Sequence, residues 1–117
     1  MAEIAWIALG GFLGAMARYA TVKVVSGRWP GKLPLGTLLV NVLGSFLLGW
    51  MAGSDAGEPI GLFLGTGFMG AFTTFSTFKL ESFNLYRRRE RAAVLLYMGL
   101  MYGLGIGAAW LGFRIGL

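Results

Sequence analysis

The chain has 117 residues, 56% of them hydrophobic and only 13% charged, with a formal net charge of +5. A soluble domain has about a quarter charged residues, so this composition indicates a membrane protein. Cysteine and histidine are absent and no catalytic triad, nucleotide loop or carboxylate pair within a span is present, so we predict neither enzyme activity nor nucleic-acid binding.

Four apolar stretches are long enough to cross a bilayer, which takes about 20 helical residues. They cover residues 4–25, 35–53, 60–80 and 92–117, and the third continues as a more polar helix towards Arg88. The connections between them are short and hold Gly, Pro or charged residues. With no linker and no internal repeat, the sequence predicts one all-α membrane domain over residues 1–117 with four transmembrane helices.

The third stretch contains the most informative segment, residues 65–78, in which three glycines precede hydroxyl side chains interleaved with phenylalanines. Glycine and threonine together permit a break in a membrane helix. Backbone freed at membrane depth is tolerated only when it is buried in protein, lines a cavity or binds an ion. We therefore predict a broken third helix in an ion-handling protein.

The side chains of this segment have two interpretations each. The hydroxyl residues are Thr73, Thr74, Ser76 and Thr77. They either bond back to their own helix or line an ion path. Phe75 and Phe78 share a helix face, and they either pack or present their positive ring edges to an anion.

Other polar residues inside or beside the spans are also open to two interpretations. Asn41 either forms an interhelical hydrogen bond, with neighbours such as Thr37 or Ser45, or faces a pore. Tyr97 is either an interfacial anchor or a pore donor. Glu81 either pairs with nearby cations or orients a pore hydroxyl.

Arg18 and Lys79 either snorkel to the interface or attract anions to a vestibule. The remaining basic residues are unevenly distributed. Basic residues dominate the first and third connections, whereas Arg114 is the only one on the side of the termini. The positive-inside rule places both termini outside. Small residues at four-residue spacing, such as Gly99, Gly103 and Gly107, permit close helix contact, and we infer an oligomer.

Several motifs in chain order resemble the Fluc family of fluoride channels. They are Gly-Gly-Phe-Leu-Gly-Ala-Met-Ala-Arg-Tyr from 10, Pro-Leu-Gly-Thr-Leu-Leu-Val-Asn-Val-Leu-Gly-Ser from 34, Gly-Phe-Met-Gly-Ala-Phe-Thr-Thr-Phe-Ser-Thr-Phe from 67, and Glu81. The resemblance covers nearly the whole chain, and the third motif with the upstream Asn41 is the most specific part.

The resemblance implies an antiparallel, dual-topology dimer with two fluoride pores in a prokaryotic plasma (inner) membrane. It implies a structural sodium ion held by the backbone carbonyls of Gly70 and Thr73 from each subunit. The implied pore residues are Asn41, Phe75, Ser76, Thr77, Phe78, Glu81 and Tyr97, with Arg18 at the vestibule. Transport is then passive export of fluoride.

The chain departs from this family in two respects. The polar track that follows Tyr97 on the fourth helix normally continues with hydroxyl residues, whereas Met101 and Gly105 stand at those positions here, with Tyr102 as a substitute. The second departure is the uneven distribution of basic residues, because a protein that inserts in both orientations should show little such bias. The chain either tolerates the bias as a homodimer or pairs with an oppositely oriented paralogue. Two alternative functions are a small four-span proton-coupled drug exporter, which lacks its required carboxylate here, and a structural membrane subunit.

Overall fold

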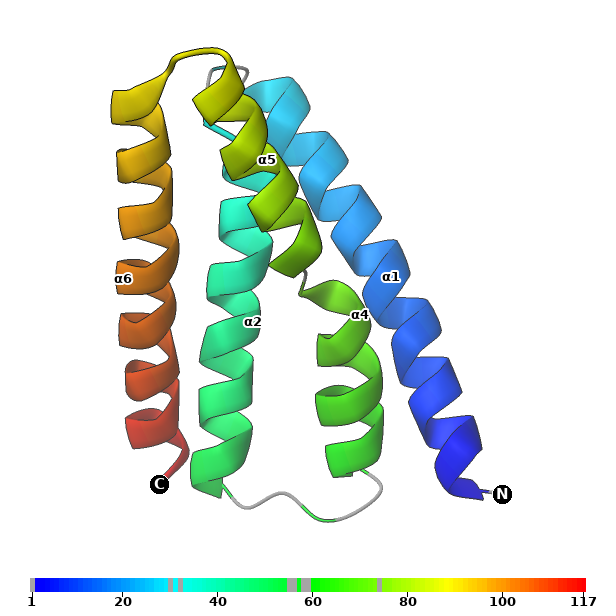
Figure 1. The fold of residues 1–117 in the computed structure, drawn as a ribbon. Coiled ribbons are helices and arrows are strands. Elements are labelled where there is room, and N and C mark those ends of the chain that lie inside the picture. Colours follow the sequence, from blue (N-terminus) through cyan, green and yellow to red (C-terminus); the bar gives the residue numbers. More distant parts are fainter. Residues whose placement is uncertain (1, 30, 32, 55–56, 58–59, 74) are drawn as a thin grey trace.

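The structure is a computed structural model that describes residues 2–29, 31, 33–54, 57, 60–73 and 75–117. Three long helices dominate it: α1 (Ala2–Arg28), α2 (Leu35–Ser54) and α6 (Arg91–Gly116). All three are long and apolar enough to cross a membrane. The two ends of the chain lie at the same end of the bundle (Figure 1).

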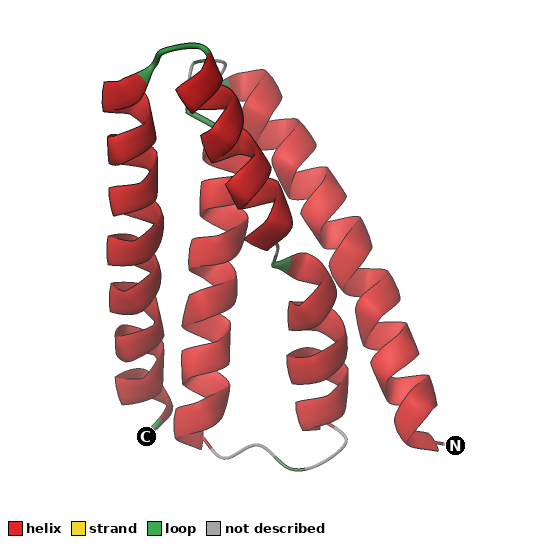
Figure 2. Cartoon of the chain, in the orientation of Figure 1, coloured by secondary structure: helices red, strands yellow, loops and turns green. Residues whose placement is uncertain are grey.

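The region of the predicted third span forms several shorter pieces. A π-helical segment, η1 (Gly61–Met69), runs directly into α4 (Gly70–Phe72), and α5 (Phe75–Arg87) follows. Between them Thr73 is extended, with φ −83° and ψ 158°. Figure 2 shows helices and loops, and the described residues contain no strand. The prediction of an all-helical protein is therefore confirmed.

Helix ends follow local sequence signals. The α2 helix begins directly after Pro34, whose carbonyl accepts a hydrogen bond from Leu38 N at 3.2 Å, consistent with the tolerance of proline at helix starts. The α5 helix ends with two bonds that reach back, from Arg89 N to Tyr86 O at 3.0 Å and from Glu90 N to Leu85 O at 3.0 Å. This is the Schellman pattern.

Two helix pairs carry most of the packing. The α2 helix lies along α6, and α1 lies along η1 and α4. Both contacts depend on glycines, because a Cβ on Gly49 would overlap the Ala109 carbonyl and one on Gly14 would overlap the Phe68 carbonyl. The backbones therefore approach closely, as small residues at helix interfaces allow.

Replacing Gly112 with alanine is expected to lower the thermal unfolding temperature of the detergent-solubilised protein. The added Cβ would overlap the Phe46 carbonyl oxygen of α2, and overpacking of this kind costs about 1–3 kcal/mol. Gly105→Ala on the same helix is the control, because its Cβ would lie at an ordinary 3.6 Å from Ser45 Oγ. An equal effect of both substitutions would contradict the close α2–α6 approach.

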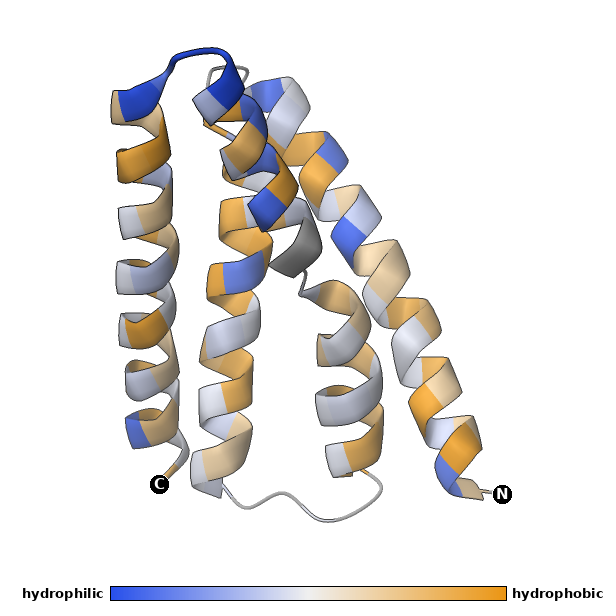
Figure 3. Cartoon of the chain, in the orientation of Figure 1, coloured by the Kyte–Doolittle hydropathy of each residue, from blue (hydrophilic) through white to orange (hydrophobic). Residues whose placement is uncertain are grey.

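Side-chain polarity divides the bundle along its length. The turn between α5 and α6 is the most hydrophilic part of the chain (Figure 3). The long helices carry many exposed apolar side chains, among them Ile106, Trp110 and Leu95. Such surfaces suit contact with lipid or another membrane chain.

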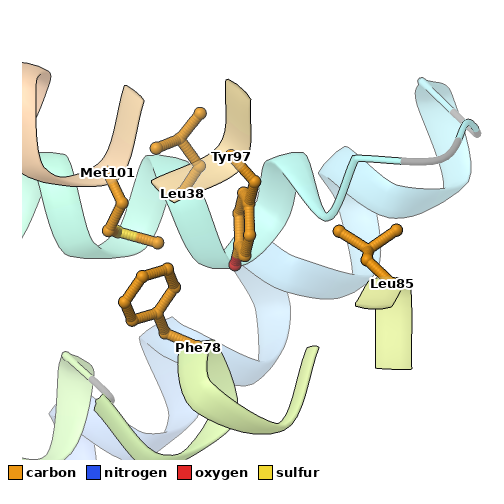
Figure 4. Close-up of a cluster of buried hydrophobic side chains, with 5 residues drawn as sticks. All are labelled: Leu38, Phe78, Leu85, Tyr97 and Met101. Carbon is orange, nitrogen blue, oxygen red and sulfur yellow. The ribbon is translucent and has the colours of Figure 1, made fainter. Parts of the chain in front are cut away.

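Buried side chains form two small clusters. Phe78 and Leu85 of α5 pack with Leu38 of α2 and with Tyr97 and Met101 of α6 (Figure 4). A second cluster holds Val40, Met69 and Phe72, which joins α2 to the η1–α4 segment. The first cluster brings together three elements that the sequence motifs mark.

In the described part of the chain, the hydroxyl oxygen of Ser82 is the one buried side-chain polar atom without a hydrogen-bond partner. An unsatisfied buried hydroxyl costs about 1–3 kcal/mol. We expect Ser82→Ala to raise the thermal unfolding temperature. Ser54→Ala is the matched control, because the Ser54 hydroxyl donates to Met51 O at 3.3 Å. Lower stability of Ser82→Ala than of Ser54→Ala would show that the Ser82 hydroxyl has a partner.

Candidate ion pathway

A groove of about 390 Å³ lies between α2, α6 and the region where α5 begins. Its lining residues are Asn41, Ser45, Leu48, Thr73, Phe78, Met101, Tyr102, Gly105, Ile106 and Ala109. The lining is mostly apolar, with a small number of hydroxyl and amide groups. This combination can hold a partly dehydrated ion without binding it tightly.

Phe78 stands at the meeting point of three helices. It is only 3% exposed. Its ring centroid lies 5.3 Å from that of Tyr97 at an interplanar angle of 61°, and 5.7 Å from that of Tyr102 at 82°. Figure 4 shows the Phe78 ring directed from α5 towards α6. Edge-to-face contacts on two sides fix the ring beside the groove.

Asn41 lies in the middle of α2 and reaches across to α6. Its Nδ2 donates to Met101 Sδ at 3.5 Å. A thioether is a weak acceptor, so an anion that enters the groove can replace it at small cost. This contact is an interhelical bond, as one interpretation of the sequence predicted, with Met101 as the partner in place of Thr37 or Ser45. The role of Asn41 as a pore donor stays a prediction.

Glu81 and Tyr97 form a hydrogen-bonded pair between α5 and α6. The Tyr97 hydroxyl donates to Glu81 Oε1 at 3.1 Å, and Tyr97 is fully buried. The Thr37 hydroxyl of α2 also bonds the Glu81 carboxylate. Glu81 therefore bonds hydroxyl groups from two other helices, and its predicted role in orienting a pore hydroxyl stays a prediction.

Arg18 lines a separate hollow on the other side of Glu81. The hollow measures about 350 Å³ and also contains Lys23 of α1, Thr37 of α2 and Thr77 of α5. Two cationic side chains, two hydroxyls and the Glu81 carboxylate thus line one hollow. The positive charge of Arg18 and Lys23 is suited to attracting small anions.

The extended residue Thr73 ends the helical run from η1 to α4. Its backbone N–H and its side-chain Oγ1 both donate to Met69 O, at 3.0 and 2.8 Å. Its methyl group occupies the space that a Cβ on Gly44 would need. At Gly70 no atom of the residues that the structure describes lies within 4 Å of the position where a Cβ would stand, so that part of the chain leaves space there for a neighbouring group.

Comparison with known proteins identifies the family. Residues 5–113 match the family model described as "CrcB-like protein, Camphor Resistance (CrcB)". The chain belongs to the CrcB family. It is 53% identical over 111 residues to the "Fluoride-specific ion channel FluC 1" of Geobacillus kaustophilus, covering 95% of both chains. It is 47% identical over 116 residues to the "Fluoride-specific ion channel FluC 2" of Bacillus thuringiensis, covering 99% of this chain and 98% of the relative.

Membership of the CrcB family confirms the resemblance that the sequence motifs indicated. Asn41 and Phe78 both line the groove. Tyr97 contacts the Phe78 ring and donates a hydrogen bond to Glu81. Arg18 and Thr77 lie in the separate hollow. Phe75 and Ser76 belong to α5, but their side chains lie outside what the structure describes, as does the whole of Thr74.

Sequence reasoning missed two members of this region. Thr37 is 2% exposed and bonds Glu81. Its position four residues before Asn41 places both on one face of α2, and that spacing was the available signal. Met101 was recognised only as a departure from the family pattern, whereas the structure makes its sulfur the acceptor for Asn41. No local pattern reports a partner 60 residues away.

Proposed function

We propose that this CrcB-family chain is a subunit of a fluoride-selective channel in a prokaryotic plasma (inner) membrane. The channel lets fluoride leave the cytoplasm passively, down its electrochemical gradient. The observation that carries the proposal is the groove beside Phe78, whose amide, hydroxyl and ring groups occur in a chain so similar to proteins named fluoride-specific channels.

The proposed mechanism replaces the hydration shell of fluoride with weak donors. Asn41 offers an amide that exchanges Met101 Sδ for the anion. The rings of Phe75 and Phe78 offer positive edges. Tyr102, which lines the groove at the point where Met101 and Gly105 carry no hydroxyl, supplies the polar group of the fourth helix. Arg18 draws anions towards the entrance.

We further propose that η1, α4 and α5 together form the third membrane span, interrupted at Thr73, with sodium bound at the break. The chemistry of the site fits a hard cation, because such ions prefer oxygen ligands and the extended backbone at Thr73 interrupts the helix beside carbonyl oxygens. Backbone oxygens of Gly70 and Thr73 are then the ligands. The open space beside Gly70 lets a second subunit bring its own pair, and the ion serves structure rather than transport.

The proposed assembly is an antiparallel dimer with two pores. The partner is either a second copy or an oppositely oriented paralogue, and the basic asymmetry favours a fixed orientation with both termini outside. Cysteine cross-linking of a Gly70→Cys variant, purified without any related chain, distinguishes the homodimer from the pair with a paralogue. A Gly70→Cys disulfide dimer in inverted orientation supports the homodimer, and a monomer that dimerises only on addition of a related chain supports the paralogue.

Efflux from liposomes tests the function directly. Protein-containing vesicles loaded with fluoride or with chloride are diluted into ion-free buffer, and release is followed with ion-selective electrodes. We expect fast fluoride release, little chloride release and no dependence on a proton gradient. No fluoride release would favour a structural subunit, and proton-coupled release of organic cations would favour the exporter.

A further inference from the structure

The turn between α5 and α6 concentrates positive charge at one end of the bundle. The basic residues described there are Arg87, Arg88, Arg89 and Arg91. The C-terminal end of α1, which finishes at Arg28, lies at the same end of the bundle (Figure 1). Neither Arg87 nor Arg88 forms an ion pair with a residue that the structure describes. Arg87 lies over the Phe83 ring, 5.9 Å from its centroid. The charge of this turn is therefore available to a ligand.

Two adjoining hollows open at this turn, and they share Asn84 and Arg88. The outer one, of about 370 Å³, is lined by Asn84, Arg87 and Arg88 only. The second, of about 440 Å³, adds apolar side chains that include Trp29 and Leu33. The Glu81 carboxylate lies in the second hollow, where it accepts the Tyr97 hydroxyl. An anion is thus favoured in the outer hollow, and the second offers apolar contacts at Trp29 and Leu33 beside its polar residues.

The backbone of this turn has an unfavourable conformation at Arg89. Arg89 has φ 60°, in the left-handed region, at the position of a Schellman motif where glycine is preferred. An L-residue there costs about 1–2 kcal/mol relative to glycine. Backbone stability alone would favour glycine, so the unusual conformation points to a role for the side chains of this turn.

We propose that this turn binds the phosphate headgroup of an anionic phospholipid. Asn84, Arg87 and Arg88 hold the phosphate in the outer hollow. The glycerol and the first acyl carbons lie against Trp29 and Leu33 in the second. Exposed aromatic residues at this end, Trp29 and Tyr86, mark the membrane–water interface, and basic pockets between membrane helices suit such headgroups. A free phosphate carries the same negative charge but has no apolar group that could contact Trp29 and Leu33.

Native mass spectrometry of the detergent-solubilised protein tests this site. Phosphatidylglycerol is added, and phosphatidylcholine and inorganic phosphate are added in parallel. We expect bound phosphatidylglycerol in preference to phosphatidylcholine. Arg88→Gln is expected to weaken phosphatidylglycerol binding about fivefold. Arg114→Gln, at the opposite end and over the Trp110 ring, is expected to leave it unchanged.

Three outcomes would overturn the proposal. Equal binding of the two phospholipids would remove the requirement for anionic charge. Equal weakening by Arg88→Gln and Arg114→Gln would show a general effect of net charge. Full displacement of phosphatidylglycerol by an equal concentration of inorganic phosphate would make the site one for free phosphate. Both arginines are exposed, and circular dichroism verifies that the variants fold.

Discussion

Phe78→Ile is expected to reduce fluoride efflux from liposomes by a factor of about ten or more. Isoleucine retains apolar bulk but has no polarised ring edge, and it loses both edge-to-face contacts with Tyr97 and Tyr102. A tenfold loss corresponds to about 1.4 kcal/mol of barrier height, which is within the range of one well-placed ring interaction with an ion. The measurement is the initial rate of fluoride release per incorporated subunit.

A matched control separates ion handling from folding. Phe83 lies on the same helix but is 56% exposed, so Phe83→Ile is expected to leave the efflux rate unchanged. Because Phe78 is buried, thermal unfolding in detergent is measured for both variants. Normal efflux by a folded Phe78→Ile protein would remove this ring from the mechanism.

Asn41→Leu is expected to abolish most fluoride efflux while the protein still folds. Leucine has a similar size and cannot donate a hydrogen bond, so an ion in the groove loses an amide donor. The contact that is lost with Met101 Sδ, at 3.5 Å, is a weak one, and thermal unfolding in detergent is measured to verify that the variant folds. The loss of a hydrogen bond to a charged group is worth about 1.5–3 kcal/mol, which predicts a rate reduction of about ten- to a hundredfold.

Asn41→Gln is the informative comparison for this position. It keeps the amide on a longer stem, and we expect intermediate fluoride efflux with chloride still excluded. The relative rates of the two anions are measured in the same vesicle preparation. Equal activity of the leucine and glutamine variants would mean that the amide does not contact the ion.

The sequence predicted the fold better than the site. Hydropathy located α1, α2 and α6 to within a few residues, because lipid imposes a requirement on every turn of a spanning helix. The segment around Thr73 was harder to predict, because a threonine in a membrane helix can bond the preceding turn without any break in the helix. In the structure the Thr73 hydroxyl donates to Met69 O, and the backbone of Thr73 is nevertheless extended.

Contacts between helices were the least predictable part of the site. Glu81 had several potential partners near it in the sequence, yet its carboxylate meets Tyr97 and Thr37 from two other helices. Helical periodicity identifies which residues share a face but not the rotation of one helix against its neighbour. The motif resemblance supplied Glu81 and Tyr97 as site residues but not Thr37, and only the structure supplied the pairing of the three.

The extended Thr73 joins two helical segments that pack mainly against different helices. On one side η1 and α4 lie against α1, and on the other α5 lies against α6, which is itself held to α2 by glycine contacts. Cooperative units of this kind exchange their amide hydrogens independently. Deuterium uptake should therefore change at this residue, with the amides of α5 exchanging before those of η1 and α4, and the α2–α6 amides retained longest.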